Sequence, residues 1–237
     1  MFQTNPFTLI IVLAGLSLIP FIAMIATSYL KIVVVMSLIR NALGIQSIPP
    51  NMVVNALAMI LTFYIMAPVA SESWGIVQKE LVGSAAVSGA AQQSGGGQLH
   101  TGHDPMLSLN PEAIGKAAEP FRRFLSEHTA PRERAFFVKT AETLWGKDGE
   151  PAVVDPEDFW ILLPSFCVSE LTKAFQIGFL VYLPFIAIDI IVSNILLAMG
   201  MMMVSPVTIS LPFKLLLFVM VNGWTLLIQG LVKGYLI

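Results

Sequence analysis

Met199-Gly200-Met201-Met202-Met203-Val204-Ser205-Pro206 is the stretch that decides the fold, because it ends a long apolar run with four methionines in five residues. A membrane helix that reaches this point has to stop and turn. Irregular backbone at membrane depth is tolerated only inside protein or along a cavity. Methionine side chains are unbranched and polarizable, so a cluster of them can repack around variable surfaces. Two interpretations stay open: a well-filled hydrophobic turn, and a deformable apolar collar around something that passes through.

The composition is that of a membrane protein interrupted by one polar region. Hydrophobic residues make up 56% of the chain and charged residues 12%, and the mean hydropathy is +0.78. Of the 28 Asp, Glu, Lys and Arg residues, 21 lie within 70–160. The net charge is −2, without a basic block, which argues against nucleic acid as a partner.

Hydrophobic segments outside the polar region predict the fold class, because a spanning helix needs roughly 20 apolar residues. They occur in two pairs, at 7–39 with 52–69 and at 177–204 with 211–236. The sequence therefore predicts an all-α protein with two membrane-associated helical hairpins and a small helical polar domain. The predicted domains are an N-terminal hairpin at 1–69, a polar domain at 70–160, and a C-terminal hairpin with the methionine-rich loop at 161–237.

The polar domain has two predicted parts. Residues 83–109 are rich in Ala, Ser, Gln and Gly and predict a flexible linker, and His100 and His103 beside it are better explained as solvated residues than as metal ligands. After the linker, Pro111 stands at the first turn of a predicted helix. Pro131 ends that helix, and a second helix is predicted at 133–145.

The connection at 40–51 predicts a helix end and an orientation. Arg40 closes the helix, Gly44 supplies a left-handed cap, and two prolines prevent continuation. Lys31 and Arg40 place this connection in the cytoplasm by the positive-inside rule, with the polar domain and both termini on the periplasmic side. Because no basic residue precedes Lys31, we expect the first segment to be retained and not cleaved as a signal peptide.

Several polar side chains inside the apolar segments require partners. An ionised carboxylate that faces lipid is costly, so Asp189 should face protein or water. Glu170 and Lys173 can pair at i, i+3. Lys214 is predicted to pair with either Glu170 or Asp189. In the first segment, Pro20 predicts a kink.

The last segment carries a polar stripe and, nearly opposite, a stripe of small residues. Such a helix is contacted on both sides, so the sequence predicts an obligate oligomer whose subunits wrap one another. A compact four-helix monomer is the alternative. Candidates for close helix packing are Gly200, Gly223, Gly230 and Gly234.

Recognisable enzymatic motifs are missing from the sequence. It has no Walker-type phosphate loop and no nucleophile elbow, and its three histidines all lie in the polar region. We therefore expect no catalytic, cofactor-binding or metal site. The single Cys167 excludes an internal disulfide.

Four groups of residues resemble the FliP/SctR family, the export-gate membrane proteins of bacterial type III secretion. They cover most of the chain apart from 83–109. The matching stretches are Arg40-Asn41-Ala42-Leu43-Gly44 with Ile48-Pro49-Pro50-Asn51, Glu119-Pro120-Phe121-Arg122-Arg123-Phe124, Pro164-Ser165-Phe166 through Ile188-Asp189, and Met199-Gly200-Met201-Met202-Met203 through Ser210-Leu211-Pro212-Phe213-Lys214.

This resemblance implies an architecture and a role. About five copies would assemble with FliQ/SctS-like and FliR/SctT-like subunits into a helical, cone-like gate in the inner membrane. Unfolded secretion substrates would pass through its centre. The implied pore constriction consists of Met199, Met201, Met202 and Met203. Flagellar members often carry a basic, cleavable signal sequence, so its absence here favours the injectisome branch over the flagellar one.

Two other classes of function remain open. A small ion-coupled transporter would use Asp189 and Lys214, and replacing Asp189 by Asn would abolish transport while assembly stayed intact. A membrane scaffold without a pore would tolerate leucines in place of the methionine cluster.

Overall fold

The chain folds into helices throughout the residues that the computed structural model describes, which are 6–45, 48–91, 111–146 and 152–236. In chain order the helices are α1 (Pro6–Ile25), α2 (Tyr29–Ala42), α3 (Asn51–Ala91), α4 (Pro111–His128), α5 (Pro131–Trp145), α6 (Phe159–Ala198), α7 (Pro206–Met220) and α8 (Gly223–Lys233). This agrees with the predicted all-α class.

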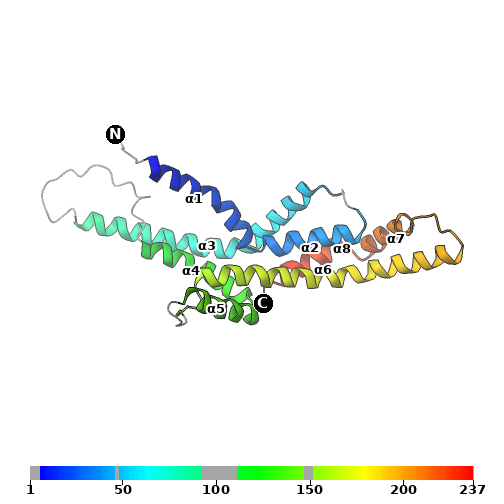
Figure 1. Cartoon of the computed structure of the whole chain (residues 1–237). Coiled ribbons are helices and arrows are strands. Elements are labelled where there is room, and N and C mark those ends of the chain that lie inside the picture. Colours follow the sequence, from blue (N-terminus) through cyan, green and yellow to red (C-terminus); the bar gives the residue numbers. More distant parts are fainter. Residues whose placement is uncertain (1–5, 46–47, 92–110, 147–151, 237) are drawn as a thin grey trace.

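The molecule is elongated, and the long helices α3 and α6 set its length (Figure 1). The α6–α7 turn, which contains the methionine-rich loop, lies at one extreme end. The short helices α4 and α5 lie near the beginning of α6, and α1 projects away from the bundle. Two ends of α6 therefore have different surroundings: packed helices at its beginning and a projecting hairpin turn at its end.

The first hydrophobic segment is broken in the structure. It consists of α1 and α2, which meet at an angle of 59°. Pro20, where a kink is predicted, lies inside α1, and the break between the two helices is at residues 26–28. At that break the Thr27 hydroxyl donates to the carbonyl of Ala23 (2.7 Å). A hydroxyl that bonds its own helix backbone favours a bend there.

The fourth hydrophobic segment is also two helices. The α7 and α8 axes meet at 60°, and Asn222 between them has a φ of 51°. Asparagine tolerates this left-handed conformation better than most residues. The predicted polar stripe, which consists of Asn222, Thr225, Gln229 and Lys233, thus begins at a break and not within a continuous helix. Gly223 follows, where an added Cβ would come within 2.3 Å of the Phe218 ring.

Two predicted boundaries fall inside helices. Helix α3 continues from the N-terminal hairpin to Ala91, so residues 83–91 are helical and the flexible linker predicted there is wrong for that part. The remaining linker residues, together with His100 and His103, lie outside the described residues. Helix α6 continues to Ala198, but it begins at Phe159, well before the start of the predicted hydrophobic segment at 177. Helices α4 and α5 begin at Pro111 and Pro131, where proline was expected to start or break a helix.

Buried apolar side chains form two clusters. The larger joins α2 and α3 to α6, α7 and α8 and includes Ile32, Val35, Ile39 and Phe185. The smaller joins α3, α4 and α6 and includes Phe124, Phe166 and Tyr235. Many large apolar residues outside these clusters are exposed on the single chain, a distribution typical of surfaces that face lipid or another protein.

Length and composition make two helices in the described residues candidates to cross a membrane. They are Asn51–Lys79 and Phe159–Ala198, and each of the two bent pairs could add one further span. The two predicted hairpins therefore persist as an arrangement, although two of their four members are bent.

Candidate functional site

The methionine loop begins where α6 ends in a Schellman cap. The backbone N–H of Met201 donates to the carbonyl of Leu196 (2.9 Å), and that of Gly200 donates to Leu197 (3.0 Å). Gly200 has a φ of +73°, which is unfavourable for a residue with a Cβ. Pro206 then starts α7 at a position where its missing N–H costs nothing. The turn between the two helices is therefore fixed at both ends by local sequence.

Methionine side chains on this loop are exposed on the single chain. The exposed fraction is 63% for Met199, 44% for Met201, 82% for Met202 and 101% for Met203. Exposure of four adjacent apolar side chains at a helix turn leaves a soft, uncovered tip. A well-filled turn would bury these side chains. On the single chain they are instead free to contact lipid or another protein.

Behind the loop, a polar cluster joins α6, α7 and the end of α2. Lys214 Nζ lies 2.6 Å from Asp189 Oδ2 and donates to the Ala42 carbonyl (3.3 Å). The Ser210 hydroxyl donates to the other Asp189 oxygen (2.5 Å). Of the two partners predicted for Lys214, the structure places it on Asp189. Because Ala42 is the last residue of α2, the ammonium group also lies at the negative end of that helix.

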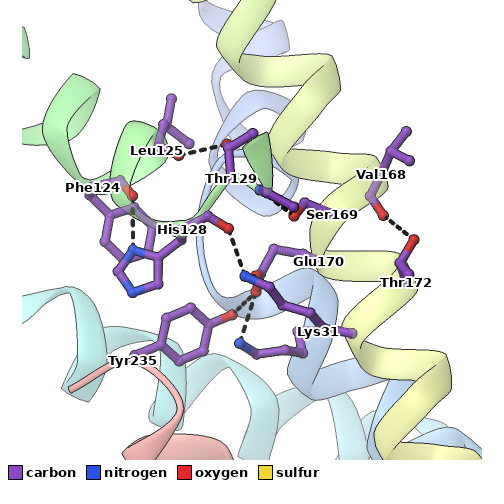
Figure 2. A network of polar contacts seen from close by, with 12 residues as sticks. Lys31, Phe124, Leu125, His128, Thr129, Val168, Ser169, Glu170, Thr172 and Tyr235 are labelled. Carbon is purple, nitrogen blue, oxygen red and sulfur yellow. Dashed lines mark hydrogen bonds and ion pairs between the residues drawn. The ribbon is translucent and has the colours of Figure 1, made fainter. Parts of the chain in front are cut away.

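A second cluster surrounds Glu170, whose side chain is fully buried (Figure 2). Lys31 Nζ lies 3.1 Å from Glu170 Oε2, and Lys173 Nζ lies 3.1 Å from Oε1. The Tyr235 hydroxyl donates to Oε2. Lys31 also lies over the Tyr235 ring, 3.5 Å from its centroid. One carboxylate thus connects α2, α6 and the residues that follow α8.

This Glu170 cluster extends to the corner between α4 and α5. Lys173 Nζ donates to the His128 carbonyl (2.7 Å), and the Ala130 N–H donates to the Ser169 hydroxyl (2.8 Å). Tyr235 packs near the rings of Phe124 and His128 at centroid distances of 6.0 and 5.1 Å. The polar helices are therefore attached to α6 at the level of the buried carboxylate.

Two polar clusters divide α6 into sections. Asp189 follows Glu170 by 19 positions, which a rise of 1.5 Å per residue converts to about 28 Å. The hydrocarbon core of a bilayer is about 30 Å thick. Charged groups inside apolar helices are costly unless paired, and both carboxylates here have partners. The two ion pairs therefore fasten neighbouring helices to α6 at two positions along its length.

Predicted site residues fall into separate groups. The structure brings Glu170 together with Lys173, and Asp189 with Lys214, while the methionines stay apart from both pairs. An added Cβ at Gly200 or Gly230 would meet no atom within 4 Å, whereas one at Gly234 would meet backbone oxygens at 3.5 Å. A packing role for Gly230 would thus require another chain.

Lys31 and Tyr235 are site residues that sequence reasoning missed. A lysine inside an apolar run was a usable signal, because such a charge needs a partner. For Tyr235 the sequence offers no comparable signal, since its role depends on the fold bringing it to α2 and α6. Among the described residues, no group of three or more His, Cys, Asp or Glu side chains is placed to hold a metal ion.

Comparison with known proteins finds a matching family and several similar proteins. The model of the FliP family matches residues 12–231. The chain is 48% identical to Yop proteins translocation protein R of Yersinia pestis, over 96% of this chain and 95% of that protein. It is 45% identical to the hypersensitivity response secretion protein HrcR of Ralstonia nicotianae, over 96% of each. It is 43% identical to the virulence protein YscR of Salmonella typhimurium, over 98% and 97%.

Proposed function

Because this chain belongs to the FliP family, we propose that its methionine loop lines the narrow part of an oligomeric protein-export pore. The chain is a component of the type III secretion export apparatus, of the injectisome branch, and it is a transport protein and not an enzyme. The finer proposal adds that several copies, with FliQ/SctS-like and FliR/SctT-like subunits, surround unfolded substrates as they cross the inner membrane.

The observation that carries this proposal is the exposed methionine tip on a fixed turn. The Schellman cap and Pro206 hold the loop backbone, while the methionine side chains stay uncovered. Flexible thioether side chains can close against one another and repack around a passing chain. A seal of this kind opens without breaking any ion pair, because the charged residues lie farther back on α6 and α7.

Asp189 and Lys214 are better explained as structural groups than as an ion relay. Each is engaged with a second partner, Ser210 for Asp189 and the Ala42 carbonyl for Lys214. Groups with this many fixed partners hold helices together. We therefore prefer the export-gate role to the ion-coupled transporter.

The test replaces Met201, Met202 and Met203 together by alanine. In cells with the complete export apparatus, we expect ion leakage across the inner membrane to rise several-fold while protein secretion continues. Met220→Ala is the matched control, because Met220 is 74% exposed but lies at the α7–α8 elbow. Leakage no greater than in that control would contradict the pore role.

For orientation, we propose that the polar helices face the periplasm and the 40–51 connection faces the cytoplasm. Tyr235 contacts the α4–α5 corner. Gly44 lies instead beside α7, the helix that follows the methionine loop, because a Cβ added to it would lie 3.7 Å from Leu211 Cδ1. These contacts put the polar helices, the end of α8 and Lys31 at one level and both hairpin turns at the other. Arg40 is then the basic residue that supports a cytoplasmic connection.

A labelling experiment tests this orientation. In a Cys167→Ser background, Lys139→Cys should react with a membrane-impermeant maleimide added to spheroplasts. Ile48→Cys should react only after the inner membrane is opened. Both positions are exposed on the chain, so the reverse result would show the opposite orientation.

A further inference from the structure

Helix α8 differs from the other helices of the bundle in how it is held. Its inner face packs through Leu227 and Leu231 into the larger core cluster. Beside that face lies an apolar cleft of about 520 Å³, lined on the α6 side by Ile177 and Val181 and on the α8 side by Leu226 and Gly230. Protein interiors are normally close-packed. The cleft therefore leaves α8 room to change its angle to α6.

One end of α8 is a sharp elbow in the backbone. Asn222 has a φ of 51°, and the helix axes on its two sides meet at 60°. A change of φ and ψ at one or two such residues swings the following element as a rigid body. Gly223 next to it lies against the Phe218 ring, so a residue larger than glycine would not fit at this position without a shift of that ring.

Just after the other end of α8, the Tyr235 side chain adds a polar contact to the apolar packing of Leu231. Tyr235 is 9% exposed and donates its hydroxyl to the fully buried Glu170. Its ring lies against Lys31 Nζ and the aromatic side chains of α4. Figure 2 shows Tyr235 directed at Glu170 beneath His128, so the contact reaches three other parts of the chain.

We propose that Tyr235 is a latch that holds α8 against the bundle, and that α8 swings at the Asn222 elbow when the latch is released. Helices α2 and α6 and the Lys31–Glu170 pair stay in place, because both lysine partners of Glu170 come from those two helices. The proposal concerns a moving part of the chain and does not depend on the pore role of the methionine loop.

Cysteine labelling in isolated membranes with the full-length chain tests the latch. In a Cys167→Ser background, Leu227→Cys reports on the buried face of α8 and Val35→Cys on the α2 core, since these positions are 9% and 0% exposed. Each reporter is measured with native Tyr235, with Tyr235→Phe and with Tyr235→Ala. Leu236→Ala serves as the control, because Leu236 is 77% exposed.

We expect Tyr235→Ala to raise the maleimide labelling rate at position 227 roughly tenfold or more, because it removes a hydrogen bond to a charged group together with a buried ring. Tyr235→Phe keeps the ring and should give a smaller rise. Labelling at position 35 should stay unchanged. No rise at 227 would overturn the proposal. An equal rise at both positions would also overturn it, because Tyr235 would then support the whole fold.

Discussion

The Glu170 cluster and the methionine loop lie toward opposite ends of α6 and reverse the usual distribution of polar and apolar groups. At the Glu170 level, a carboxylate and Lys31 are buried almost completely. At the loop, Met202 and Met203 are almost fully exposed. Buried charges with fixed partners permit few geometries, whereas exposed methionines permit many. Helix α6 therefore connects two different regions. The Glu170 and Asp189 clusters form a rigid frame, and the methionine loop forms a deformable tip.

The strongest way to break this contrast is Glu170→Gln. It leaves Lys31 buried with its charge unmatched, which costs about 3–5 kcal/mol. We expect the amount of full-length chain in membranes to fall sharply and the midpoint temperature of its thermal unfolding to drop. Glu119→Gln is the matched control, because Glu119 also pairs at i, i+3, with Arg122, but is 58% exposed. Equal losses in the two variants would refute a special role for burial.

Asp189→Asn tests the second level of the frame. Lys214 is 4% exposed and would keep only the Ala42 carbonyl and an amide as partners. Loss of a charge-assisted bond predicts a destabilisation of about 1.5–3 kcal/mol. The primary defect should be in assembly of the membrane complex, measured by native electrophoresis, and any loss of secretion should follow from it. Normal assembly with abolished transport would instead favour the ion-coupled transporter.

Gly200→Ala probes the link between frame and tip. A Cβ meets no atom within 4 Å at this site, so the cost comes only from the φ of +73° and should be about 1–2 kcal/mol. Thermal unfolding of the purified chain would measure it. Gly230→Ala is the control, since Gly230 also has open space but lies within a helix. Alanine there should be neutral or slightly stabilising.

Met202→Leu should have the smallest effect and sharpens what the tip requires. Leucine conserves volume and hydrophobicity, and the side chain is 82% exposed, so stability should change by less than about 0.5 kcal/mol. Any effect should appear in ion leakage, because leucine is less flexible than methionine. A clear loss of stability would mean that the loop is packed in the folded chain.

Sequence reasoning succeeds where local chemistry fixes the structure. Gly44 adopts the predicted left-handed φ, at +78°, and prolines begin α4 and α5. It misses the breaks at 26–28 and 221–222, because the apolar runs resume directly after Thr27, Ser28 and Asn222, so each pair of helices reads as one continuous segment. The choice between Glu170 and Asp189 for Lys214 also needed the fold, since both carboxylates lie on the same helix.

Tyr235 follows every described helix in the chain, so it leaves the ribosome after all of them. Until it is made, Glu170 lacks its hydroxyl donor and α8 is packed only through its apolar face. The order of synthesis therefore makes the Tyr235–Glu170 hydrogen bond the last contact of the Glu170 cluster to form, after the preceding helices have been made. A chain stopped short of residue 235 would still contain both lysine partners of Glu170 but would lack this hydrogen bond.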